Sequence, residues 1–222
     1  ISNEMKKTLE LHKFLQNAVS KSQKCQRNWD TDVSIPQEDL ETLKHAVTQC
    51  PSKQNIAHYK VSFITDRDLI QDIFKSTKGF YTKEDLSEAE CNSQVLANLL
   101  VVFEDYNVKN ARAPEYKAFH SASETPEDQK NLVERDQWMS VGIASGMLAL
   151  TATMLGYRTG YCACFNVEEI VKKLNPENQT SAMPLLMLGI GVPKKGHLRI
   201  YNQDNTYAYP TFAKQEIPIK FI

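Results

Sequence analysis

The sequence predicts an α+β fold in which a small central sheet is covered by helices. Segments with a helical apolar period outnumber segments that alternate as strands, and more than one helix separates successive strands. A second observation is the uncharged run Trp138–Tyr157, WMSVGIASGMLALTATMLGY, which is apolar on opposite faces. A helix of this kind is buried all round or lies in a membrane. Its three glycines and its serines and threonines favour the central helix of a soluble protein.

A pair of glycines inside this run suggests a helical neighbour. Gly142 and Gly146 form a G-x-x-x-G pattern, which in lipid suits a helix dimer. In a soluble chain the same small residues let another helix approach closely. That neighbour could belong to a partner subunit.

The elements before the central helix follow from local patterns. An apolar stripe in the first 22 residues predicts an amphipathic helix, with His12 packed on the same stripe. Ser34, followed three residues later by Gln37, is the predicted N-cap of the next helix. The elements predicted in this half are helices at 4–22, 36–50, 66–74 and 82–91, and strands at 59–65 and within 95–103.

The segment Glu104–Arg135 is polar and has no sustained period. We expect an inserted loop with short helices, of the kind that forms lids and binding loops, and disorder is the alternative. After the central helix, Gly156 is a helix stop, and Asn166 caps a further helix with Glu169 three positions on. A buried strand is predicted at 184–192, and the chain ends in EIPIKFI, which alternates like a strand.

Composition limits the classes of function. The formal net charge of −1 removes the electrostatic case for nucleic acid or an acidic membrane surface. Five cysteines in a chain without a visible secretory signal are expected to be reduced thiols in a cytoplasmic protein. The histidines are scattered, so no metal site is predicted. Cys162 and Cys164 are interpreted as two buried thiols. No nucleophile or dinucleotide motif is found.

A basic cluster follows the last buried strand; it consists of Lys194, Lys195, His197 and Arg199. The cluster is either a solvated turn or a phosphate site, because lysine and arginine pair well with phosphate oxygens.

Five motifs occur in an order that is more specific than any one of them. They are QKCQRNW at 23–29, PSKQN at 51–55, the block 92–103, the central helix with LGYRTGYCACFN, and PLLMLGIGVP at 184–193. On these motifs the chain resembles the nitroreductase family of FMN-dependent oxidoreductases. The resemblance leaves out only 104–135 and about the last twenty residues. It implies a mostly antiparallel sheet in a single domain over 1–222, within an intertwined homodimer.

The resemblance also implies which residues bind FMN. The family's FMN-binding run near the N-terminus is matched by Lys24, Cys25 and Arg27, and the match places Arg27 beside the pyrimidine edge of the flavin. Gln23 and Cys25 replace the arginine and serine that are usual there. The alternative for Arg27 is a surface ion pair with Asp30 or Asp32.

Further matches complete the predicted cofactor site. A loop given by the other subunit corresponds to Pro51, Ser52, Lys53 and Asn55, with Ala57, His58 and Tyr59 in place of the family's Q-P-W. Asn92 and Gln94 match a turn at the polar edge of the flavin. Ala163 and Cys164 match a strand whose backbone amides face flavin N5. Arg199, with Lys195 as second choice, matches the basic residue on the phosphate.

The implied activity is a ping-pong transfer of hydride from NAD(P)H through FMN to a nitroaromatic, a quinone or a similar conjugated acceptor. The flavin does the chemistry, so no catalytic side chain is predicted. The predicted acceptor contacts in the lid are Tyr106, Tyr116, Phe119 and His120. The tail 203–222 is expected to pack on the partner subunit. The alternatives are a flavin-fragmenting, dehalogenating or azoline-oxidising relative, and a flavin-binding partner protein with little turnover.

Overall fold

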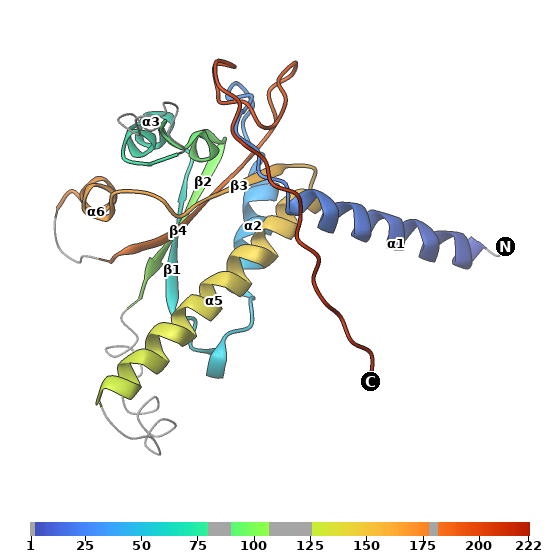
Figure 1. The fold of residues 1–222 in the computed structure, drawn as a ribbon, viewed down its shortest axis with the longest axis horizontal. Helices are drawn as coiled ribbons and strands as arrows, with labels where there is room; N and C mark the ends of the chain where they lie inside the picture. Colours follow the sequence, from blue (N-terminus) through green and yellow to red (C-terminus); the bar gives the residue numbers. More distant parts are fainter. Residues whose placement is uncertain (1–2, 80–89, 107–125, 178–181) are drawn as a thin grey trace.

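A four-stranded sheet forms the centre of the computed structural model (Figure 1). The structure describes residues 3–79, 90–106, 126–177 and 182–222. Along the sheet the strands follow the order β1-β2-β4-β3, and all neighbours are antiparallel. The strand bounds are Tyr59–Ile64 for β1, Leu99–Asp105 for β2, Arg158–Cys162 for β3 and Pro184–Gly191 for β4. The predicted α+β fold with a small antiparallel sheet is therefore confirmed.

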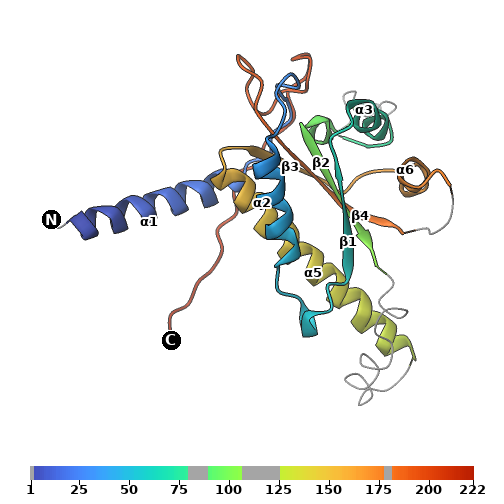
Figure 2. The same ribbon diagram turned by 180° about the vertical axis from the view of Figure 1, so that it is seen from behind.

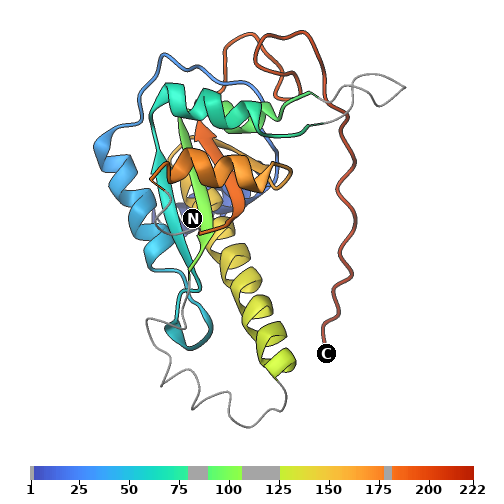
Figure 3. The same ribbon diagram turned by 90° about the vertical axis from the view of Figure 1, so that its left-hand side faces the viewer.

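Helices cover both faces of this sheet. Helices α2 and α5 pack on one face, whereas α3 and α6 lie on the other (Figure 3). The helix bounds are Asn3–Ser22 for α1, Gln37–Thr48 for α2, Arg67–Lys75 for α3, Pro126–Met154 for α5 and Val167–Leu174 for α6. Two short 3-10 helices, η1 at Lys53–Asn55 and η2 at Ser93–Leu96, complete the described elements.

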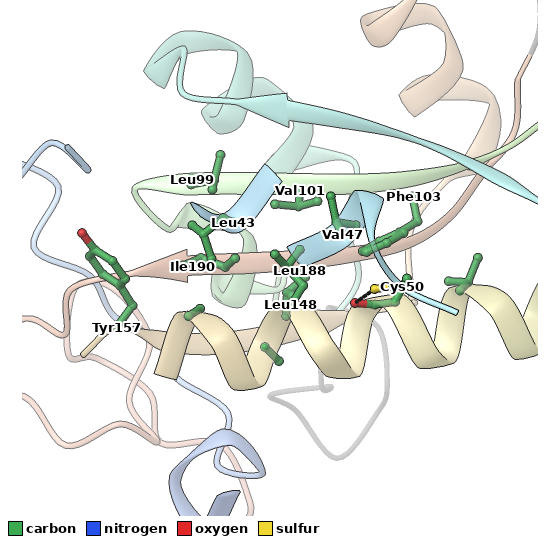
Figure 4. Packing of buried hydrophobic residues seen from close by; sticks show 14 of the residues in the cluster. Leu43, Val47, Cys50, Leu99, Val101, Phe103, Leu148, Tyr157, Leu188 and Ile190 are labelled. Carbon is green, nitrogen blue, oxygen red and sulfur yellow. Dashed lines mark hydrogen bonds between the residues drawn. The ribbon is translucent and has the colours of Figure 1, made fainter. Parts of the chain in front are cut away.

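Strand β2 lies inside both cores. Val101 and Phe103 belong to the core beneath α2 and α5, where Leu148 of α5 faces the sheet (Figure 4). Leu100 and Val102 point to the opposite core, beneath α3 and α6. Because both faces of the sheet are covered by helices, the strand has the continuous apolar sequence LLVVF instead of alternating apolar and polar residues.

Helix α5 begins earlier than the sequence predicts. It spans 29 residues from Pro126, so the expectation of an irregular segment over 126–135 is wrong. Its first turns extend past the end of the sheet (Figure 3), and a helix that covers no sheet there needs no apolar stripe. Glu104 is also outside any loop, because it belongs to β2. The predicted stop is confirmed at Gly156, which has a φ of +97° after the last helical residue.

Two local predictions differ from the structure. Pro36, not Ser34, occupies the N-cap of α2, and no side chain caps this helix. Glu38 and Asp39 instead place negative charge in its first turn, where the helix dipole favours it. The EIPIKFI tail forms no strand in the single chain, because it runs away from the body and from every sheet edge (Figure 2). Most of the helix predicted at 82–91 lies outside the described residues.

Several apolar surfaces stay exposed in the single chain. Helix α1 projects away from the body (Figure 1), and its stripe, His12 included, faces solvent. On the outer face of α5, Ile143 is 44% and Met147 40% exposed, and an added Cβ at Gly142 or Gly146 would meet nothing within 4 Å. In the part of the chain that the structure describes, no helix combines the length and apolarity that crossing a membrane requires.

Candidate functional site

The segment that contains Arg27 is fastened to the edge of the sheet. The backbone N–H of Gln26 donates to the carbonyl of Thr159 in β3 at 2.8 Å, and Cys25 forms a parallel bridge with the same residue. From the C-terminal part of the chain, Nη1 of Arg199 donates to the carbonyl of Cys25 at 3.2 Å. The structure therefore brings Cys25, Arg27 and Arg199 together.

Two guanidinium groups share this part of the structure. Burial is the largest of the effects that lower the pKa of Arg27, and the positive charge of Arg199 lowers it further. Cys25 and Tyr209 oppose this effect. Among the described residues, no Asp or Glu forms an ion pair with either arginine, and the surface pair with Asp30 or Asp32 is not formed. Neighbouring cations without a carboxylate are suited to an anionic ligand.

The turn at Asn92–Gln94 lies beside the same segment. Oδ1 of Asn92 accepts from the backbone N–H of Gln94 at 3.1 Å and so caps η2. Gln94 packs against Gly160 of β3, where an added Cβ would come within 2.9 Å of the Gln94 Cβ and 2.6 Å of the Gln26 carbonyl. Glycine at position 160 thus permits the close approach of these three segments.

The end of β3 forms another border of this group. Ala163 and Cys164 follow the strand and are exposed, and the carbonyl of Cys164 accepts from the backbone N–H of Lys78 at 2.8 Å. Burial raises the pKa of the Cys162 thiol to about 11, against a smaller opposing effect from Asn92. The prediction of two buried thiols is wrong for Cys164, because the chain leaves the sheet directly after Cys162.

The loop Pro51–Asn55 is the part of the predicted site that the single chain places elsewhere. Oγ of Ser52 accepts from the backbone N–H of Ala57 at 2.9 Å, and Nζ of Lys53 donates to Asp136 at 2.8 Å. Asp136 is 18 residues before the end of α5, which corresponds to about 27 Å along the helix axis. The Arg27 segment attaches to β3 beyond that end. One chain therefore leaves these two parts of the site far apart.

The remaining predicted residues make few contacts. Lys24 and Lys195 are exposed, and within the described part of the chain their side chains form no hydrogen bond or ion pair with the residues above. Lys194 instead donates to the carbonyl of Gln203 at 3.3 Å. Tyr106 is 45% exposed at the end of β2. The other predicted acceptor contacts, Tyr116, Phe119 and His120, lie outside the described residues.

Tyr209 is a neighbour of this group that the sequence motifs do not indicate. Its ring lies under the Arg27 guanidinium, with the Cζ atom 4.9 Å from the ring centroid. Its hydroxyl donates to the carbonyl of Cys91 at 2.9 Å. The only local signal is an aromatic residue in a polar stretch, NTYAYP, which does not reveal a partner 182 positions earlier. The described residues contain no cluster of three or more potential metal ligands among His, Cys, Asp and Glu.

The comparison with protein families shows which family the chain belongs to. The nitroreductase family model matches residues 21–192. The chain belongs to the nitroreductase family. A search of curated proteins finds no match for this nitroreductase-family chain.

Solved structures share the fold of this family member at low identity. A putative NAD(P)H:FMN oxidoreductase from Staphylococcus epidermidis is 17% identical with a TM-score of 0.62, over 93% of this chain and 95% of that chain. A putative nitroreductase from Exiguobacterium sibiricum, solved in complex with FMN, is 15% identical with a TM-score of 0.60. The match covers 89% of this chain and 91% of that chain. A nitroreductase family protein from Clostridium novyi NT is 20% identical with a TM-score of 0.56. The match covers 80% of this chain and 84% of that chain.

Proposed function

We propose that this chain is an FMN-dependent oxidoreductase that passes hydride from NAD(P)H, through flavin N5, to a small conjugated acceptor in a ping-pong cycle. The observation that carries the proposal is the pair Arg27 and Arg199, which lie together without a carboxylate partner among the described residues. Membership of the nitroreductase family and the FMN in a structural neighbour support it.

The residues of this group fit FMN. Arg199, with exposed Lys195 nearby in sequence, would hold the phosphate, because both side chains pair with phosphate oxygens. Arg27 would face the pyrimidine edge, and Asn92 and Gln94 would add polar contacts there. When bound, FMN supplies the redox chemistry, so the chain needs no nucleophile or acid–base pair of its own. Its side chains bind and orient the cofactor and set the charge around it.

A homodimer would complete the site. The loop Pro51–Asn55 stays at the far end of α5 from its own Arg27, so we infer that it serves the partner subunit. The open face around Gly142 and Gly146 and the exposed stripe of α1 offer apolar surface for such an interface. Of the predicted tail, the part that ends at Tyr209 packs against its own chain, so the proposal for the partner concerns residues 210–222.

The acceptor side of the site is proposed to include Tyr106 and the segment 107–125 that follows it. Tyr106 offers an exposed ring at the end of β2, where this segment begins. Shortening 107–125 should change which acceptors are reduced while FMN stays bound. An unchanged acceptor profile would contradict a role of this segment in acceptor binding.

The absorption spectrum of the purified protein tests the central proposal. We expect a bound flavin band, FMN uptake by the apoprotein, and NAD(P)H consumption when a quinone is present. Arg199→Gln should weaken FMN binding, whereas Lys172→Gln, which removes the same charge from exposed α6, should not. A colourless protein that takes up no added FMN would exclude the proposed function.

A further inference from the structure

Tyr209 lies outside residues 21–192, which the family model matches, yet it touches the centre of the candidate site. Only 3% of the residue is exposed. Its ring faces the Arg27 guanidinium at 4.9 Å, its hydroxyl donates to the carbonyl of Cys91, and its backbone N–H donates to the carbonyl of Ile200 at 2.8 Å. One side chain therefore joins Arg27 to the segment that leads into Asn92.

The Tyr209 ring lies against the Arg27 guanidinium and can restrain it. Across the described residues, no hydrogen bond or ion pair from this guanidinium is formed. A cation–π contact is not a hydrogen bond to an oxygen acceptor, and a guanidinium has five N–H donors, so donors that do not point at the ring stay available to a ligand. Tyr209 can thus hold Arg27 in place without consuming the hydrogen bonds that an anionic partner would accept.

The loop that carries Tyr209 is itself tied to the Arg27 segment. Nδ2 of Asn28 donates to the carbonyls of Leu198 at 2.7 Å and Tyr201 at 3.0 Å. The backbone N–H of Trp29 donates to Oε1 of Gln203, and Nε2 of Gln203 donates to the carbonyl of Trp29, both at 2.8 Å. Four hydrogen bonds therefore fix residues 198–203 against residues 28 and 29, and the backbone hydrogen bond from Tyr209 to Ile200 links the ring-bearing residue to this segment. This arrangement makes the position of the ring relative to Arg27 a built feature of the fold.

We propose that Tyr209 is a positioning residue that orients Arg27 toward the pyrimidine edge of the flavin. This inference rests on the proposed function, since it needs FMN in the site. The phenol ring does the positioning, and the hydroxyl anchors the ring to Cys91. Loss of the ring lets the guanidinium rotate away, whereas loss of the hydroxyl alone keeps the cation–π contact.

The test compares Tyr209→Phe, Tyr209→Leu, Arg27→Gln and the double variant Arg27→Gln with Tyr209→Leu. The readouts are the FMN dissociation constant, from flavin fluorescence, and the flavin midpoint potential of FMN-saturated protein. Tyr207→Leu is the matched control, because it removes a ring from the same loop that packs on Tyr209 but makes no cation–π contact with Arg27. Thermal unfolding of each variant reports any loss of folding.

Tyr209→Leu should raise the FMN dissociation constant by on the order of tenfold and lower the potential in the same direction as Arg27→Gln. Tyr209→Phe and Tyr207→Leu should stay close to the parent. In the Arg27→Gln background, Tyr209→Leu should change the potential no further.

A parental potential in Tyr209→Leu would overturn the inference while the proposed function stands. The inference would also be overturned if Tyr207→Leu lost as much FMN affinity and potential as Tyr209→Leu. The same holds if Tyr209→Leu lowered the potential by its full amount in the Arg27→Gln background, because either result would mark a general loosening of the loop. A parent protein that takes up no FMN would exclude the proposed function, and this inference with it.

Discussion

Lys53 reaches across the chain to Asp136, and its Nζ donates to Oδ2 at 2.8 Å. The Asp136 side chain is fully buried, whereas a third of the Lys53 side chain is exposed. The pair ties the loop before β1 to the first part of α5. It thereby fixes a loop in which Asn55 and Ala57 have φ values of +59° and +50°, a conformation that costs on the order of 1–2 kcal/mol for a residue such as alanine.

Removal of Lys53 should cost more stability than neutralisation of its partner. Lys53→Met leaves a buried carboxylate whose nearest remaining cation is Arg135, at 3.4 Å, and we expect a loss of about 3 kcal/mol. Asp136→Asn leaves Lys53 able to turn toward water, so the loss should be about 1–2 kcal/mol. Urea unfolding at pH 7 measures both, with the exposed Lys44→Met as control. The reverse order would mean that the buried Asp136 carboxylate does not depend on Lys53 for its stability.

Tyr157 connects the end of α5 to α2, because its hydroxyl donates to the Asp39 carboxylate. Burial, followed by the hydrogen bond and the charge of Asp39, raises the pKa of Tyr157 from 10.0 to about 12. Folding therefore favours the protonated phenol. The contribution of the protonated phenol to the free energy of unfolding is complete below pH 10, and it is lost as the pH rises from about 10 to about 12.

Tyr157→Phe should lower the free energy of unfolding by about 1 kcal/mol at pH 7, because it removes this hydrogen bond. The variant should also lose less stability than the parent between pH 10 and 12. Unfolding by urea across this pH range measures both effects. The exposed Tyr106→Phe serves as control and should follow the parent. If the parent and Tyr157→Phe lost the same unfolding free energy between pH 10 and 12, the assigned pKa shift would be contradicted.

Elements that carry their own local pattern were predictable from the sequence. Oδ1 of Asn166 accepts from the Glu169 backbone N–H at 3.2 Å and caps α6, as the spacing indicates. Strand β4 matches its apolar run within one residue. The early turns of α5 were not predictable. They carry charged residues, and the buried Asp136 among them depends on a partner 83 positions away.

Within the candidate site, the motifs point to several residues that lie near β3, but they do not indicate which other residues contact them. Cys25 and Gln94 both pack against β3, and Arg199 donates to the carbonyl of Cys25, so these residues lie near one end of the sheet. The contact of Tyr209 with Arg27 depends on how the C-terminal loop folds back, which no local pattern records. The separation of the Pro51–Asn55 loop likewise follows from the length of α5.

Gly146 gives a direct test of the proposed dimer. In the single chain an added Cβ there meets nothing within 4 Å, so Gly146→Leu should stabilise a monomer by about 1 kcal/mol through helix propensity. In a dimer with closely packed α5 faces, the same change should separate the subunits and release FMN. Gly146→Ala, which adds one methyl group, is the size control. Light scattering at micromolar concentration would refute the proposal if Gly146→Leu stayed dimeric, or if the parent were a monomer.

In the proposed site, Arg27 would lie where its charge can influence a bound flavin. The reduced cofactor carries more negative charge on its pyrimidine edge than the oxidised cofactor, so a guanidinium there favours reduction. Two unit charges 4 Å apart interact by about 4 kcal/mol at an effective dielectric constant of 20, and partial exposure reduces this value. A surviving difference of roughly 1.4 kcal/mol corresponds to about 30 mV for a two-electron couple.

Arg27→Gln should therefore lower the flavin potential by tens of millivolts and slow hydride transfer from NAD(P)H, beyond any loss of FMN affinity. Potentiometric titration of FMN-saturated parent and variant measures the shift. Lys172→Gln is the control, because it removes one positive charge from an exposed position on α6. It should keep the parental potential. Equal potentials in parent and Arg27→Gln would show that this guanidinium does not face the flavin, since a charge beside the cofactor must change its reduction energy.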